Sequence, residues 1–398
     1  MNLREKLRAV GGTAEGAKRP VKAAERDCAH TAVYRGAEEF PGAWDLKRET
    51  LAMMTRAELP AAFDPKKILY LDTETTGLGG SGTVAFLVGL GYLTDTGFEV
   101  HQFWMRDYPE EPYVLRHTAA GLGRFDAVCT FNGAAFDLPL LESRFLMNRM
   151  DRDCLDLPHI DLLPLCRRLW KLRLGRCNLG RLEEIILGKP RDEDLPGSLV
   201  PERYFSYLRT GDESLLTDIL EHNAQDIASL CVLLNHMAKL YEHPESIRFS
   251  EDVYSMGRAL EKEQHPEKAR RCYVLARRGR MGDAASLALA ASHRRAGERE
   301  EAARVWREMV RDRRGGIVPL VELAKYEEHI RRDIPAAIAW TEQALAMLSE
   351  PSLPGKEFRY GNLTVQETKN ELQYRYLRLK RRLEGAVKNG NLNHVQGQ

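Results

Sequence analysis

The chain has 398 residues, of which 43% are hydrophobic and 29% charged, and its formal net charge is +1. This composition predicts a globular protein with a substantial core and more than one domain. The sequence has no run of about 18 apolar residues and no secretory-type apolar segment, so we expect no membrane span and a cytoplasmic location. Because the net charge is close to zero, any nucleic-acid site must depend on local charge or on bound metal.

The seven cysteines are scattered and include no Cys-x-x-Cys pair, which is the pattern of reduced thiols in a cytosolic protein. A zinc site would have to draw on Cys154, His159, Cys166 and Cys177. Their spacing matches none of the paired-ligand patterns. We therefore expect ordinary thiols.

The first part of the chain is the least regular. Residues 1–59 carry Gly and Pro turns and only broken apolar patterning, which predicts a partly disordered N-terminal extension. Trp44 and Leu46 could dock this extension on the body of the protein. Three short apolar runs follow and predict an antiparallel meander, at 68–71, 84–92 and 98–104.

Helices and strands alternate after the meander. The predicted elements are a helix at 110–122, a strand at 127–131, a helix from 136, a strand at 159–162, helices at 165–172, 179–186 and 201–209, and a long helix at 215–241. Three antiparallel strands followed by alternating helices and strands predict an α/β domain over residues 60–243.

Residues 244–349 have fully helical patterning with a weak repeat. Ala269, Ala302 and Ala337 lie 33 and 35 residues apart, each with an aromatic residue three to four positions later. A period near 34 residues resembles tetratricopeptide helix pairs, and an irregular helical bundle is the alternative. We expect residues 350–398 to form a capping helix and a polar tail, with one apolar face made of Leu372, Tyr376, Leu379 and Leu383.

Two carboxylates stand at the end of the first apolar run. Asp72 and Glu74 are two residues apart, so a strand aims both at one side, and the glycines from Gly77 onward end that strand. Asp137 follows the strand at 127–131, at the edge where α/β sheets carry ligand sites. Oxygen ligands at one rim indicate a hard divalent cation.

The predicted long helix at 215–241 carries a second pair of candidate site residues. His222 and Asp226 are four residues apart and therefore share one helical face, where a base and a metal ligand could act together. A solvated helix face is the alternative interpretation of an isolated His and Asp.

The order of these residues resembles a known family. Asp72-Thr-Glu74-Thr-Thr-Gly-Leu78, Asn132 to Asp137, and His222 to Asp226 follow the order of the DEDD exonuclease motifs, which implies a ribonuclease H-like fold. The second half more closely resembles the YprB-like branch of ribonuclease H-like proteins. The stretches that carry this likeness are 194–198, 204–212 and the helical repeats.

The resemblance implies a two-metal 3′-5′ exonuclease acting on single-stranded DNA or RNA. Two Mg²⁺ or Mn²⁺ ions would be held by Asp72, Glu74, Asp137 and Asp226, with His222 as general base. Thr75, Thr76, Leu78 and Asn132 would contact the terminal nucleotide.

One departure concerns His222. It lies four residues before Asp226, whereas the histidine subclass of the family has five and the tyrosine subclass has four. The resemblance therefore supports the four acids as metal ligands more strongly than it supports His222 as the general base.

Two other groups of residues have a plainer interpretation. Asp161, at the end of the predicted strand 159–162, is expected to be structural or to support the metal ligands from behind. The basic clusters at 277–280, 294–295 and 311–314 are interspersed with acids and read as solvated helix faces rather than as a phosphate track.

Alternative functions remain open. The same fold could serve a structure-specific RNA endonuclease. The repeats could instead make this a scaffold that binds a protein partner or nucleic acid and carries a vestigial nuclease domain.

Overall fold

A computed structural model describes residues 27–55, 59–77, 82–191, 195–349 and 360–395. At its centre is a six-stranded mixed sheet with the order β1-β4-β3-β2-β5-β6. The first four strands in this order pair antiparallel, and β2, β5 and β6 pair parallel. The strands are β1 (Ala29–Gly36), β2 (Ile68–Thr75), β3 (Ala85–Leu93), β4 (Gly97–Trp104), β5 (Ala127–Thr130) and β6 (His159–Asp161).

The sheet begins before the predicted domain boundary. β1 pairs with β4 from Ala29 opposite Trp104 to Gly36 opposite Gly97, so the boundary at residue 59 is corrected and this strand belongs to the α/β domain. β1 is an edge strand whose side chains are alternately exposed and half-buried, which is why it lacks an apolar run. The Trp44 indole donates a hydrogen bond to the Thr94 carbonyl at 2.8 Å, which confirms the docking expected of Trp44.

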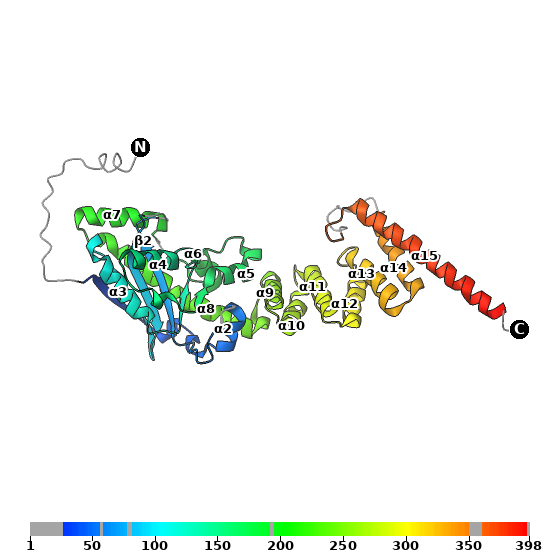
Figure 1. Ribbon diagram of the computed structural model, residues 1–398, viewed down its shortest axis with the longest axis horizontal. Helices are drawn as coiled ribbons and strands as arrows, with labels where there is room; N and C mark the ends of the chain where they lie inside the picture. Colours follow the sequence, from blue (N-terminus) through cyan, green and yellow to red (C-terminus); the bar gives the residue numbers. More distant parts are fainter. Residues whose placement is uncertain (1–26, 56–58, 78–81, 192–194, 350–359, 396–398) are drawn as a thin grey trace, which may run out of the picture.

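Helices cover both faces of the sheet (Figure 1). Successive side chains along a strand point alternately toward the helices on one face and those on the other. Ile68 and Tyr70 of β2 pack in the core that contains α8, whereas Leu69 and Leu71 face the core of α3, α4 and α7. The helices of this domain are α2 (Arg48–Thr55), α3 (Glu111–Leu122), α4 (Asp137–Met147), α5 (Leu162–Leu174), α6 (Leu179–Leu182), α7 (Val200–Thr210) and α8 (Ser214–Glu242).

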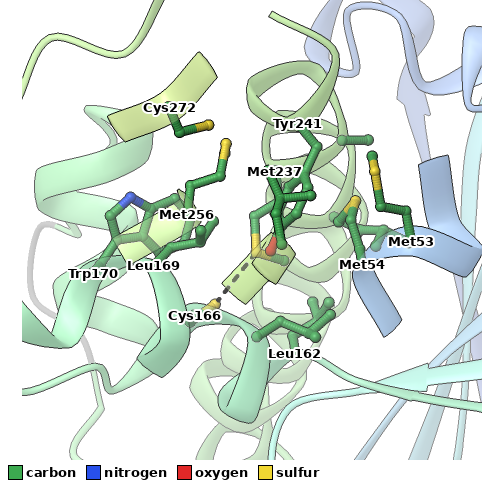
Figure 2. Close-up of a cluster of buried hydrophobic side chains, with 14 of the residues drawn as sticks. Met53, Met54, Leu162, Cys166, Leu169, Trp170, Met237, Tyr241, Met256 and Cys272 are labelled. Carbon is green, nitrogen blue, oxygen red and sulfur yellow. Dashed lines mark hydrogen bonds between the residues drawn. The ribbon is translucent and has the colours of Figure 1, made fainter. Parts of the chain in front are cut away.

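The apolar core continues from the α/β domain into the helical region. Figure 2 shows Trp170 of α5 close to Met256 of α9 (Ser250–Lys262), while Met237 of α8 lies between this group and Met53 and Met54. All five side chains are buried. Because one apolar core spans the junction, the two regions pack directly against each other and are not joined only by a linker.

The helical region consists of successive antiparallel pairs that extend away from the sheet (Figure 1). Ala269, Ala302 and Ala337 are fully buried, one in the second helix of each pair. The predicted helical region is thus confirmed, and its tetratricopeptide character stays a prediction. Its helices are α9 (Ser250–Lys262), α10 (Pro266–Ala276), α11 (Gly282–Arg295), α12 (Arg299–Arg311), α13 (Val318–Tyr326), α14 (Ile334–Met347) and α15 (Val365–Val395).

The last helix is held by apolar and ionic contacts. Leu372 and Leu379 are buried, as the predicted apolar face requires. Three arginines of α15 pair with Glu328, whose side chain is fully buried: Arg375, Arg378 and Arg382. Helix α15 runs to Val395, into the segment expected to be a polar tail.

Arginines from the basic clusters of the repeats have acidic neighbours. Arg277 pairs with Glu308 at 2.8 Å, and Arg294 pairs with Glu322 at 2.5 Å. These contacts fit the expected ion-paired helix faces. No helix in the described ranges has the length and apolar character needed to cross a bilayer.

Candidate active site

Asp72 stands on the face of β2 that α8 covers. Its neighbour across the β2–β3 ladder is Gly89. A Cβ at Gly89 would lie 2.2 Å from Asn223 Oδ1 and 2.3 Å from Ile227, both on α8. Glycine at this position therefore lets α8 approach the strand closely enough to reach Asp72. Glu74 lies two residues further along the same face, beside a register shift, after which the β2–β3 pairing continues with Thr75 opposite Ala85.

A chain of amides fixes the Asp72 carboxylate. Asn223 Nδ2 donates to Asp72 Oδ2 at 2.8 Å, and Asn223 Oδ1 accepts from Gln102 Nε2 at 2.9 Å. Gln102 also donates to the Leu220 carbonyl at 2.8 Å. Because both amides are buried, their donors and acceptors are used within the protein, and Asp72 is held in one orientation.

The surroundings of Asp72 disfavour its charge. Loss of hydration raises the pKa of Asp72 well above its ordinary value, and the charges of Asp226, Glu74 and Asp137 raise it further. The bond from Asn223 opposes this rise. In the described part of the chain, this carboxylate accepts a side-chain hydrogen bond from Asn223, and no lysine or arginine pairs with it. A bound cation would relieve the repulsion.

Asp137 approaches from the other layer as the first residue of α4. Thr73 Oγ1 donates to Asp137 Oδ1 at 2.6 Å. Burial raises the pKa of Asp137 to about 6, although the Thr73 bond acts to lower it. Asp137 is thus half-protonated near pH 6 unless a cation stabilises the charged form.

Asp226 lies beside a positively charged side chain of the protein, that of Arg191. Arg191 Nη2 donates to Asp226 Oδ1, and Nη1 of the same guanidinium lies 3.2 Å from His222 Nδ1. His222 Nε2 is 3.7 Å from Asp226 Oδ2, which places both on one helical face as predicted. Loss of hydration raises the pKa of Asp226, and the charges of His222 and Arg191 act against that rise.

The guanidinium donates only, so His222 Nδ1 accepts in this contact. The neutral ring then carries its proton on Nε2, a tautomer assigned from the hydrogen bond.

The predicted nucleotide-contact residues fall into three groups. Thr75 and Asn132 line a cavity of about 550 Å³ together with Asp72 and Asp137. Thr76 instead closes the turn, since its Oγ1 accepts from the Val84 amide at 3.0 Å. Leu78 lies outside the described residues.

Asp161 holds the backbone of Asn132 in position. Asn132 has a left-handed backbone with φ of 69°, and its amide donates to Asp161 Oδ1 at 2.8 Å. Asp161 also accepts from the amides of Ala134 and Leu163. The structural role expected of Asp161 is confirmed, because it shapes the loop that carries Asn132 to the cavity.

The four acids surround one site without closing into a tight ligand cluster. Among the described residues, one group of three possible ligands lies within 4.8 Å of one another, and it is Asp27, Cys28 and His117, away from this site. Glu74, Asp137 and Asp226 are near enough to raise the pKa of Asp72 through their charges. Carboxylate oxygens, three of them on acids whose pKa is raised, fit hard divalent cations.

Several residues of the site were missed by sequence reasoning. Phe136 lines the cavity with a ring that is 53% exposed, and it could have been noted as an aromatic beside a candidate ligand. Asn223 could have been noted as a polar residue on the buried face of the long helix. Arg191 gave no signal, because only the fold brings it to Asp226.

Comparisons with known proteins place this site in a family. The RNase H superfamily matches residues 69–238, a range that includes all four acids and His222. A protein of Bacillus subtilis (strain 168), named uncharacterized protein YprB, is 30% identical over 298 residues, which are 72% of each chain.

A solved family B DNA polymerase from the hyperthermophilic archaeon Pyrobaculum calidifontis is a more remote match. It aligns with 52% of this chain at 17% identity and a TM-score of 0.35, and the alignment covers 28% of the polymerase chain. Superfamily membership supports a nuclease that uses divalent metal. The chain is a member of the YprB family within the RNase H superfamily.

Proposed function

We propose that this protein is a metal-dependent 3′-5′ exonuclease of single-stranded nucleic acid. The observation that carries the proposal is the pair Asp72 and Asp137, two carboxylates with raised pKa values that line one cavity. Carboxylates in such surroundings gain most from a divalent cation.

Each residue has a distinct part in the proposed reaction. Asp72, Glu74, Asp137 and Asp226 hold two ions of Mg²⁺ or Mn²⁺. When bound, the ions lower the pKa of a water molecule and stabilise charge on the leaving oxygen. His222 would take the proton of that water through Nε2, which requires the ring proton to move from Nε2 to Nδ1 and the Arg191 contact with Nδ1 to be released.

The cavity supports recognition of a strand end. Its volume of about 550 Å³ is in the range of small-molecule pockets, which a single nucleotide would fill. Phe136 offers an exposed ring on which a base can stack, and Thr75 and Asn132 offer polar contacts. The helical repeats provide a further surface for a protein partner.

Digestion of end-labelled strands tests the proposal. Purified protein is incubated with 5′-labelled single-stranded DNA or RNA in Mg²⁺, Mn²⁺ or EDTA, beside Asp137→Ala. A ladder shortened from the 3′ end, formed only with metal and absent for Asp137→Ala, is expected. Internal products would indicate an endonuclease, and equal products from the variant would contradict the proposal.

A further inference from the structure

Arg191 joins a proposed metal ligand to a buried acid that the mechanism does not use. Its Nε and Nη2 donate to the two carboxylate oxygens of Glu183 at 2.6 and 2.7 Å. Nη2 also donates to Asp226. Nη2 carries two N–H bonds and therefore bridges a structural carboxylate and a proposed ligand.

The two carboxylates hold Arg191 differently. Glu183 is fully buried in the single π-helical turn after α6, and Ser229 of α8 donates a hydrogen bond to it. Its two-pronged bond to the guanidinium fixes the planar group in place. Asp226 is partly exposed and can take another partner without disturbing this anchor.

A divalent ion on Asp226 would compete with the guanidinium. Two positive groups on one carboxylate repel each other and share its single negative charge, so coordination of Asp226 weakens its bond to Arg191. The Nη2 donor is then released beside the site while Glu183 still holds the side chain. Phosphate is the group to which a fixed guanidinium donates best.

The surroundings leave room for such a phosphate. A second cavity, of about 620 Å³, is lined by Arg191 and His222, by the basic residues Lys189 and Arg35, and by the acids Glu39, Asp218 and Glu221, of which Glu39 pairs with Arg35. The Arg191 side chain is 13% exposed. A ligand in this cavity can therefore reach it.

We infer that Arg191 is a positioning residue that exchanges partners: it neutralises Asp226 in the metal-free protein and binds a backbone phosphate of the strand once a divalent ion occupies Asp226. This inference rests on the proposed function, since it needs both the ion and the strand. Glu183 keeps the guanidinium in place during the exchange.

Three variants separate this role from simple neutralisation of Glu183. Arg191→Gln removes the charge, Arg191→Lys keeps a charge without the two-pronged geometry, and Glu183→Gln combined with Arg191→Gln removes both charges. The double variant leaves no unpaired acid in the core and therefore guards against misfolding. Mn²⁺ affinity without nucleic acid and steady-state cleavage of a single-stranded oligonucleotide are measured for each.

The double variant is expected to bind Mn²⁺ roughly 10-fold more tightly than the wild type, because the competing guanidinium is gone. Its kcat/KM is expected to fall roughly 100-fold, mainly through a higher KM, because the phosphate contact is lost. Arg191→Lys should keep Mn²⁺ affinity closer to the wild type and recover only part of kcat/KM.

Wild-type Mn²⁺ affinity or wild-type kcat/KM in the double variant would overturn the inference, leaving Arg191 as a counter-ion of Glu183. That result differs from failure of the proposed function. In the latter case the wild type itself would neither bind Mn²⁺ nor cleave, and the inference would fall with it.

Discussion

Asp72 and Asp226 lie near enough for the charge of one to raise the pKa of the other, but different groups contact them. Asp226 contacts the Arg191 guanidinium and lies near His222, and both charges counter the pKa rise that burial causes. Asp72 receives an amide N–H from Asn223 and is surrounded by three other acids. The chain thus supplies positive charge on the Asp226 side. On our proposal, the Asp72 side depends on cations from solution.

The largest effect is expected when the charge of Asp72 is removed. Asp72→Asn is expected to lower cleavage by roughly 10³-fold or more, because metal coordination contributes several kcal/mol to transition-state stabilisation. Turnover with Mn²⁺ is measured beside Asp95→Asn, a change in an exposed hairpin turn. Retained turnover in Asp72→Asn would show that the Asp72 side needs no metal.

His222→Ala tests the base on the Asp226 side. General-base catalysis contributes roughly 10²- to 10⁴-fold, so a loss of this size is expected while Mn²⁺ affinity is retained. The same titration and turnover assays measure both quantities. Wild-type turnover would remove the base role from His222.

Asp137→Asn should stabilise the metal-free protein while abolishing cleavage. The pKa of Asp137 is raised to about 6 from an ordinary value of 3.8. The unfolded chain therefore releases its proton at a lower pH, and the folded state loses stability as pH rises from the lower value to the higher. The cost is of the order of 3 kcal/mol above about pH 6.

Urea unfolding with EDTA at about pH 7.5 and pH 4 measures this effect. The variant should gain stability over the wild type at the higher pH and lose most of that advantage at the lower pH. An equal difference at both pH values would contradict the raised pKa.

Gly89→Ala tests the close contact that brings α8 to Asp72. The added Cβ would meet Asn223 and Ile227 at distances that force α8 outward. A loss of about 1–3 kcal/mol in unfolding free energy is expected, with lower activity because Asn223 and Asp226 both move with the helix. Gly180→Ala is the matched control, since its Cβ would meet nothing within 4 Å. Equal stability of the two variants would contradict the close packing.

Thr73→Val is expected to have the smallest effect. Loss of its bond to Asp137 should raise the pKa of that acid further and cost about 1 kcal/mol, or roughly 5-fold in Mn²⁺ affinity near pH 6. The difference should shrink at about pH 8, where Asp137 is ionised in both proteins. A pH-independent difference would point to altered packing.

The strand meander and the long helix were predictable because their apolar patterns match their structural periods. Asp72, Glu74 and Asp137 were found because carboxylates at strand ends have a local signature. β1 was missed because an edge strand with half its side chains exposed lacks that pattern.

The partners of the acids were harder to predict for a different reason. Gln102 and Asn223 are 121 positions apart, and Arg191 is 35 positions from Asp226. Contacts of this kind depend on tertiary packing rather than on local periodicity. Sequence reasoning therefore located the acids and left out the groups that set their charge.

Calorimetric titration of the metal-free protein with Mn²⁺ near pH 6, in buffers of different ionisation enthalpy, measures both ion binding and the protons that the carboxylates release. Mn²⁺ is expected to bind to the wild type with release of protons, because Asp137, whose pKa is raised to about 6, is partly protonated in the metal-free protein, and the raised pKa of Asp72 acts in the same direction. Asp72→Asn should bind more weakly and release fewer protons. Absence of binding, or identical binding and proton release in the variant, would contradict a metal site at these carboxylates.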